Sequence, residues 1–121
     1  MNNYRALTND EIHQLESFGN RAEDWKNVQV TEAFDASLVR GNIFMGQVWL
    51  GALNPNYIHD GDLRLPEGVY NSCLADATVG DHCAVHNVHM LGGYRVGNHC
   101  LLFNIDEMTA SDPAANPEYA W

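Results

Sequence analysis

A ten-residue segment that occurs twice in this chain constrains its fold more than any other feature. Residues 79–88 read Val-Gly-Asp-His-Cys-Ala-Val-His-Asn-Val, and residues 96–105 read Val-Gly-Asn-His-Cys-Leu-Leu-Phe-Asn-Ile. Where an aliphatic residue changes near the end of the segment, another aliphatic residue replaces it. A repeat of this kind indicates a chain that winds in successive coils, each of which stacks on the coil before it.

The region around the repeat divides into units of six residues, with one unit of five. An apolar residue opens each unit between residues 73 and 107, and in several units a small residue stands four places later. Three such units make one triangular coil, and successive coils stack like parallel strands about 4.8 Å apart. The opening aliphatic residues should point inward and form ladders: Val79 on Val96, Val85 on Leu102, and Val88 near Ile105.

Asparagines recur near one corner of the predicted coil. They stand at positions 42, 71, 87 and 104, and asparagine tolerates the left-handed backbone angles that a tight corner requires. The sequence Asn42-Ile43, followed by Leu50-Gly51, echoes the later repeats, so the coils extend more loosely over residues 38–51.

Two segments depart from the coil pattern. Residues 8–19 read as an amphipathic helix, with a capping box between Thr8 and Glu11 and a stop at Gly19. A shorter helical turn is expected from Asn20 to about Asn27. Residues 52–68 contain Asp60-Gly61, a strong hairpin signal, and predict a β-hairpin inserted at a coil corner.

The fold class that follows is mainly β, and the six-residue units resemble the hexapeptide-repeat, left-handed parallel β-helix. We expect about three coils over residues 31–109, a helical cap over 1–30, and an extended tail over 110–121. Such a short stack leaves an open end with unpaired strand groups, which calls for more chain or for a partner subunit.

A closer resemblance covers most of the chain. It is carried by Ala-Glu-Asp-Trp at 22–25, Phe-Asp at 34–35, Gly-Val-Tyr-Asn-Ser at 68–72, and Phe-Asn-Ile-Asp-Glu-Met at 103–108. These segments are similar to the N-terminal part of a large bacterial family of uncharacterised left-handed β-helix proteins. The resemblance implies that members are much longer and that this chain is a truncation or a short relative. It supplies a fold and no catalytic residues.

Charge and cysteine content narrow the partners and the compartment. The chain of 121 residues has a formal net charge of -10, and residues 41–121 carry only Arg64 and Arg95 as cations. An acidic surface repels nucleic acid and anionic membranes, so neither is expected as a partner. Three cysteines without metal-type pairing, no apolar run long enough to cross a membrane and no signal core predict a cytoplasmic protein with reduced thiols.

The repeated His-Cys pair suggests a metal site, but strand geometry argues against one. Adjacent residues of a strand point to opposite sides, so His82 and His99 should face outward as a stacked pair while Cys83 and Cys100 face inward. Four such ligands cannot converge on one ion, and we therefore expect no metal.

The candidate catalytic residues are His86, His89 and Asp106. In the predicted stack His86 lies opposite Phe103 and His89 lies opposite Asp106, and a histidine beside a carboxylate is the minimum for an oriented general base. By the count of six His89 also suits an inward position, where it would be a core histidine bonded to Asp106.

Two functions remain open. The first is a non-catalytic scaffold or assembly module, normally the first part of a longer β-helix, with further coils or identical subunits as partners. The second is a diverged hexapeptide-repeat acyltransferase that acts on a small sugar or amino substrate at a groove between subunits of a homotrimer. No cofactor is identified, and acetyl-CoA enters only under the second interpretation.

Overall fold

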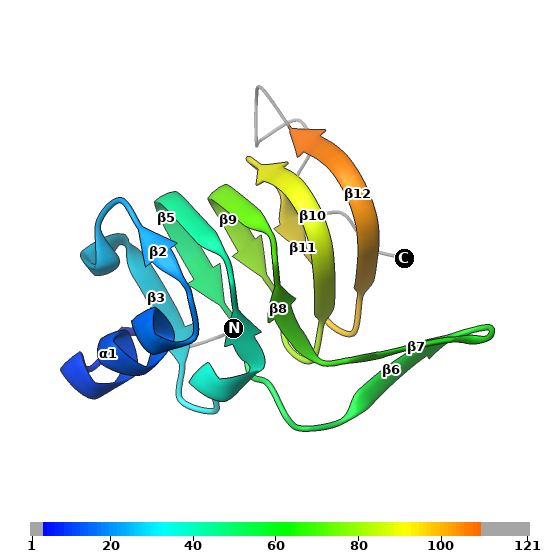
Figure 1. The fold of residues 1–121 in the computed structure, drawn as a ribbon, viewed down its shortest axis with the longest axis horizontal. Coiled ribbons are helices and arrows are strands. Elements are labelled where there is room, and N and C mark those ends of the chain that lie inside the picture. The colour runs from blue at the N-terminus through cyan, green and yellow to red at the C-terminus, as the bar shows by residue number, and fades with distance from the viewer. Residues whose placement is uncertain (1–3, 110–121) are drawn as a thin grey trace.

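The computed structural model describes residues 4–109, in which strands predominate and the one α-helix, α1 (Asn9–Ser17), lies at one end (Figure 1). Two short 3-10 helices, η1 (Trp25–Asn27) and η2 (Ala36–Leu38), join strands. The strands are β1 (Tyr4–Ala6), β2 (Arg21–Ala22), β3 (Val28–Thr31), β4 (Val39–Arg40), β5 (Ile43–Leu50), β6 (Tyr57–Asp60), β7 (Leu63–Pro66), β8 (Gly68–Tyr70), β9 (Cys73–Val79), β10 (Ala84–Gly92), β11 (Arg95–Val96) and β12 (Leu101–Thr109). The mainly β class predicted from the repeat is confirmed.

Ten strands form one curled sheet in which successive passes of the chain pair in parallel (Figure 1). Strand β10 pairs with β12 at a constant offset, which places Val85 beside Leu102 and Val88 beside Ile105. Strand β11 pairs with β9, so Val79 lies beside Val96. The three ladders predicted from the repeat are therefore confirmed, and the repeat interval is the length of one pass.

The interior of the curled sheet is aliphatic because the residues that face inward from each strand are mostly aliphatic. Val85, Leu91 and Leu102 are fully buried, and Cys83 and Cys100 occupy the same core as small apolar side chains. Cys83 also donates its thiol proton to the carbonyl oxygen of Gly97, 3.0 Å away on the next pass.

Left-handed residues turn the chain between strands. Asn71, Asn87 and Asn104 have φ angles of 53°, 56° and 54°, as predicted for one corner. His82 and His99 have φ angles of 56° and 58°, and so mark a second corner. Each corner repeats from pass to pass, because the same backbone bend must recur wherever the coil turns.

Asn42 is not a corner residue, contrary to the sequence prediction. The corner on that pass is Gly41, with φ 71°, and Asn42 points into the core, where its side chain is fully buried. Its amide nitrogen donates to Asn20 Oδ1 and to the carbonyl of Val69, and its Oδ1 accepts from the Ser72 amide. The prediction was shifted by one residue because glycine can replace asparagine at a left-handed position.

Helix α1 begins and ends as its sequence predicts. Thr8 caps it, Glu11 completes the capping box, and the chain leaves at Gly19, which has φ 85°. Arg5 of β1 donates two hydrogen bonds to the Glu11 carboxylate, at 2.8 and 2.9 Å, and these hold the pKa of Glu11 at about 2. The cap is thereby tied to β1, which pairs antiparallel with β3.

The second helical turn expected over residues 20–27 is only partly present. Arg21 and Ala22 instead form β2, which pairs in parallel with β5, and only η1 is helical. Trp25 of η1 does dock on the next layer, edge-on to Phe44 with ring centroids 6.0 Å apart.

The predicted hairpin is present and projects from the body (Figure 1). Strands β6 and β7 pair antiparallel, and Asp60 lies opposite Leu63, so the two turn residues are Gly61 and Asp62. The turn predicted from Asp60-Gly61 therefore lies one residue further along the chain. Gly61 takes its left-handed position, with φ 61°. The tail predicted over residues 110–121 lies outside the described residues.

Candidate functional site

His86 packs where the hairpin returns to the body. Its Nε2 lies 2.9 Å from the carbonyl oxygen of Pro66, and its ring lies 4.5 Å from the ring of Tyr70, centroid to centroid. Because a carbonyl only accepts hydrogen bonds, Nε2 carries the hydrogen. Burial lowers the pKa of His86, so the ring is neutral near pH 7. Its position opposite Phe103 is as predicted.

His89 and Asp106 meet on the outer surface rather than in the core. The side chain of His89 is 77% exposed, that of Asp106 is fully exposed, and His89 Nδ1 lies 3.8 Å from Asp106 Oδ1. The predicted contact exists, but the inward position considered for His89 is wrong. The corner at Asn87 separates His86 from His89 in the chain, and the two rings contact different partners. The catalytic role of these three residues stays a prediction.

A carboxylate and an imidazole that the sequence analysis did not pair lie together at the base of the hairpin. Glu67 has a side chain only 6% exposed, and its Oε1 lies 3.0 Å from His82 Nδ1 and accepts a 2.9 Å hydrogen bond from the Asn54 amide. The ring of His82 stacks on that of His99, with centroids 5.3 Å apart, as predicted for an outward pair. The carboxylate therefore fixes one ring of the stacked pair.

Chemically, this Glu67–His82 pair is an oriented imidazole. A carboxylate that accepts from Nδ1 leaves Nε2 as the hydrogen-bond acceptor, the arrangement of a general base. The same contacts join the hairpin to the coil, since Glu67 and Asn54 belong to its two ends. No sequence pattern predicts this pair, because Glu67 and His82 lie 15 residues apart in the chain, on either side of a coil corner.

The three cysteines form no disulfide bond, and Cys83 and Cys100 are buried. Burial raises the pKa of Cys83 to about 12, and it also raises the pKa of the less buried Cys73. Among the described residues no group of three or more histidines, cysteines and acids is arranged to hold a metal ion.

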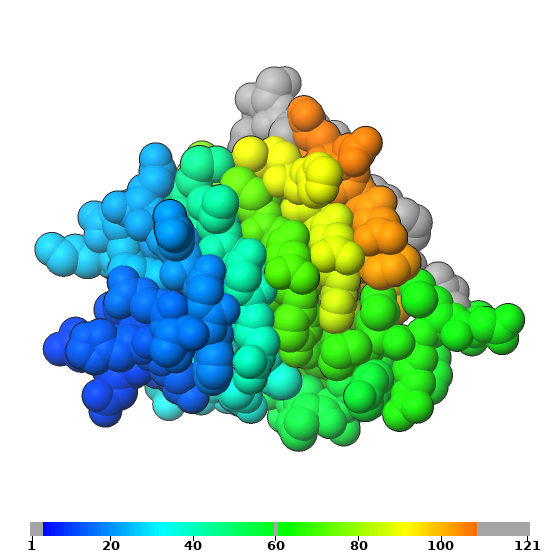
Figure 2. Space-filling model, viewed as in Figure 1, coloured from blue at the N-terminus to red at the C-terminus, as the bar shows by residue number. Residues whose placement is uncertain are grey.

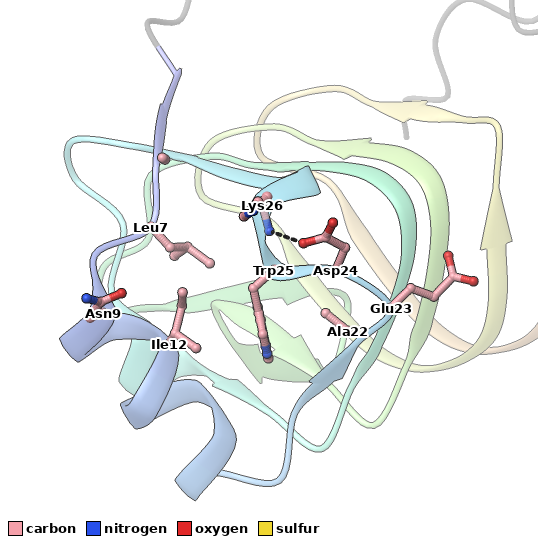
Figure 3. A pocket seen from close by; sticks show the side chains of 9 residues that line it. Leu7, Asn9, Ile12, Ala22, Glu23, Asp24, Trp25 and Lys26 are labelled. Carbon is pink, nitrogen blue, oxygen red and sulfur yellow. Dashed lines mark hydrogen bonds between the residues drawn. The ribbon is translucent and has the colours of Figure 1, made fainter.

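A pocket of about 530 Å³ opens at the capped end of the molecule, between α1, β2 and η1. Figure 3 shows the side chains of Leu7, Ile12 and Trp25 pointing into the same space, with Asp24 and Lys26 at the rim. Trp25 is held by a 3.2 Å hydrogen bond from its Nε1 to Glu16. The pocket is thus a gap in the cap, and none of His82, His86, His89 and His99 lines it.

At the other end of the stack the sheet is open. Within residues 4–109, β12 pairs with β10 and with no other strand. Its Phe103 is 38% exposed. A strand edge of this kind presents a row of amide and carbonyl groups that can pair with a further strand.

Within residues 4–109, no helix is long and apolar enough to cross a membrane.

Comparison with known proteins supports the part of the resemblance that assigns this chain to an uncharacterised family. An uncharacterised protein of Treponema pallidum (strain Nichols) is 36% identical to this chain over 111 residues, which make up 92% of the chain. The chain spans only 15% of the length of that relative. No solved structure matches the chain. The model of a domain of unknown function (DUF4954) matches residues 4–116, and the chain therefore belongs to the DUF4954 family.

Proposed function

We propose that this chain is a non-catalytic assembly module that begins a longer left-handed parallel β-helix. The observation that carries the proposal is the difference between its two ends. One end of the sheet carries α1 and the antiparallel strand β1, whereas the other ends in β12, a nine-residue parallel strand. A stack that is covered at one end and open at the other can grow in one direction only.

The β-helix itself is supported by the spacing of the strands and the corners. Passes β10 and β12 pair in parallel at a constant offset, and the corner residues of successive passes share left-handed backbone angles. These are the features that the six-residue units predict for a left-handed coil. A crystal structure of the chain tests the handedness directly, and a right-handed path would contradict it.

Further coils of the same kind are the partner we propose for β12. The relative from Treponema pallidum is several times longer than this chain, which leaves room for such coils. Each added coil would bury inward aliphatic residues against Leu102 and give the β12 backbone a second set of hydrogen bonds.

Extending the stack by one coil tests this proposal. A second copy of residues 93–109, inserted after Thr109, keeps the interval at which β10 and β12 pair. We expect the melting temperature to rise by about 5 °C or more, since each kcal/mol shifts it by roughly 4 °C in a domain of this size. The control inserts the same segment in scrambled order. Equal melting temperatures for the two insertions would show that β12 does not accept a coil.

The acyltransferase alternative has one observation in its favour, the contact between His89 and Asp106 on the outer surface. It requires a homotrimer, because the acceptor groove would lie between subunits, and it requires acetyl-CoA. Sedimentation equilibrium followed by calorimetry with acetyl-CoA distinguishes the two functions. Binding that is lost in His89→Ala would favour the enzyme, and a monomer that binds no acetyl-CoA would exclude it.

We also propose that the protein resides in the cytoplasm. No disulfide joins Cys83 and Cys100, although they are neighbours on successive passes, and this suits a reducing compartment. Alkylation of thiols in intact cells, followed by mass spectrometry, tests the proposal. A Cys83–Cys100 disulfide in the cellular protein would contradict it.

A further inference from the structure

The hairpin formed by residues 57–66, which we name the arm, reaches past the end of the stack. In Figure 1 the strands from β3 to β12 follow one another along the long axis of the molecule, and the tip of the arm lies beyond β12 in that direction. Figure 2 shows the arm standing clear of the rest of the surface, beside the last strand. The arm therefore occupies the level of the stack that coils added to β12 would occupy.

One face of the arm, which we call its apolar face, carries three aliphatic residues. Ile58 lies opposite Leu65, and Leu63 falls on the same face because side chains alternate along a strand. By the same alternation Asp60, opposite Leu63 at the tip, belongs to this face. The other face carries His59 and Arg64, and the guanidinium of Arg64 lies over the Tyr57 ring, 4.1 Å from its centroid.

The arm has little else to pack against. Among the described strands, β6 and β7 pair only with each other. Two strands alone are marginally stable in water, because they bury too little apolar surface. The face made by Ile58, Leu63 and Leu65, which the body leaves partly exposed, is therefore available to a partner.

Hydrogen bonds hold the base of the arm to the coil, so the arm has a fixed orientation relative to the stack. His86 donates to the Pro66 carbonyl at 2.9 Å, Tyr70 donates through its hydroxyl to the Glu67 carbonyl at 3.2 Å, and the Glu67 carboxylate bonds to His82. All three bonds come from the coil at the point where β7 ends. A surface held in its bound position before binding loses less entropy when a partner arrives.

We propose that the arm is a clasp whose apolar face packs against the outside of the parallel coils that continue the stack from β12. The proposal rests on the assembly function above and names the surface that secures it. A four-residue strand spans roughly 13 Å, or about three strand spacings, so the arm can contact more than one added coil. The partner of the arm is therefore a set of β-coils whose outward side chains are apolar. These coils pair with β12, and the arm covers part of their outer surface.

A thermodynamic cycle tests the clasp. The first background is the natural chain, and the second carries two further copies of residues 93–109 after Thr109. In each, Ile58→Ser and Leu65→Ser are introduced together, and His59→Ser on the polar face is the matched control. We expect the double substitution to lower the melting temperature of the extended chain by at least about 4 °C more than that of the natural chain, and we expect the control to act equally on both.

The outcomes separate the two proposals. If the extended chain is no more stable than its scrambled counterpart, no coil stacks on β12, and both the assembly function and the clasp are wrong. If the extension stabilises the chain but the double substitution acts equally in both backgrounds, the assembly function stands and the clasp is overturned. A larger effect in the extended chain alone supports both.

Discussion

At the scale of the residue, burial decides the chemistry of the thiols. Cys83 donates to Gly97 in the core, and its pKa is raised to about 12, so almost no thiolate exists at neutral pH. We expect iodoacetamide at pH 8 to modify Cys73 first and to leave Cys83 intact until the protein unfolds. Peptide mass mapping over time, with and without urea, measures this. Equal rates at the two cysteines in the folded protein would contradict the buried position.

The imidazole of His86 should make stability sensitive to mild acid. Burial lowers its folded-state pKa below the ordinary value of 6.5, so below that pH the unfolded chain binds more protons than the folded one. Stability contributed by the neutral ring is therefore present above pH 6.5 and is lost as the pH falls below it. We expect the urea midpoint to fall between pH 7 and pH 5, and to fall less in His86→Asn. An NMR titration in which His86 has a pKa above 6.5 would reverse the sign.

The prediction from strand alternation that Cys83 and Cys100 point inward and His82 and His99 outward is confirmed, although both histidines lie at left-handed corners rather than within strands. The same rule could not reveal that His82 meets Glu67, because their contact depends on where the hairpin rejoins the coil. Nor could it settle His89, whose inward or outward position depends on how the chain leaves the corner at Asn87.

At the scale of the element, a buried polar ladder joins the cap to the first passes of the chain. Asn20 donates to the Leu15 carbonyl in α1 and accepts from Asn42, which in turn accepts from the Ser72 amide. Ser72 Oγ then accepts from the Val88 amide at 3.1 Å. These side chains stand in line with Val88 and Ile105 of later passes, so polar groups replace aliphatic ones where the helix is attached.

Breaking this ladder at its centre should be costly. Asn42→Ala removes the acceptor of the Ser72 amide and the side-chain donor to the Val69 carbonyl, and each buried unsatisfied group costs about 1–3 kcal/mol. Asn20 Oδ1 keeps its hydrogen bond from the backbone amide of residue 42. We expect Asn42→Ala to lower the free energy of unfolding by about 3 kcal/mol in urea titrations followed by circular dichroism. The control is Asn87→Gly, which keeps the left-handed corner and should change stability by less than about 1 kcal/mol. Equal effects would mean that Asn42 serves only a turn.

The sequence predicted the strands and ladders of the later passes well, because the interval between them is constant. It failed by one residue on the earlier pass, where Ile43 pairs with Cys73 across a longer interval because the hairpin is inserted between them. A shift of one residue exchanges inward and outward positions, and this is why Asn42 was assigned to the corner. Insertions therefore limit how far a repeat can be extended by counting.

At the scale of the whole molecule, the parallel pairing of β10 with β12 determines which backbone groups of β12 point away from β10. Ala84 donates to the Cys100 carbonyl and lies opposite Leu101, so the β12 residues that bond to β10 are Cys100 and Leu102. In a parallel strand the groups of alternate residues point to opposite sides, so the Phe103 amide points to the outer edge. Phe103 is thus the place where pairing at that edge can be blocked without disturbing β10.

An open edge should make the isolated chain associate with itself, since a long strand pairs with any second strand available. We expect the mass measured by sedimentation velocity to rise with concentration above the 13.5 kDa of one chain. Phe103→Pro removes the outward amide hydrogen and should keep the chain at that mass at all concentrations. Phe103→Ala, which removes the ring but keeps the amide, should still associate. If the proline and alanine variants associate alike, the contact lies elsewhere on the surface, and the outer edge of β12 is not where this module accepts its next strand.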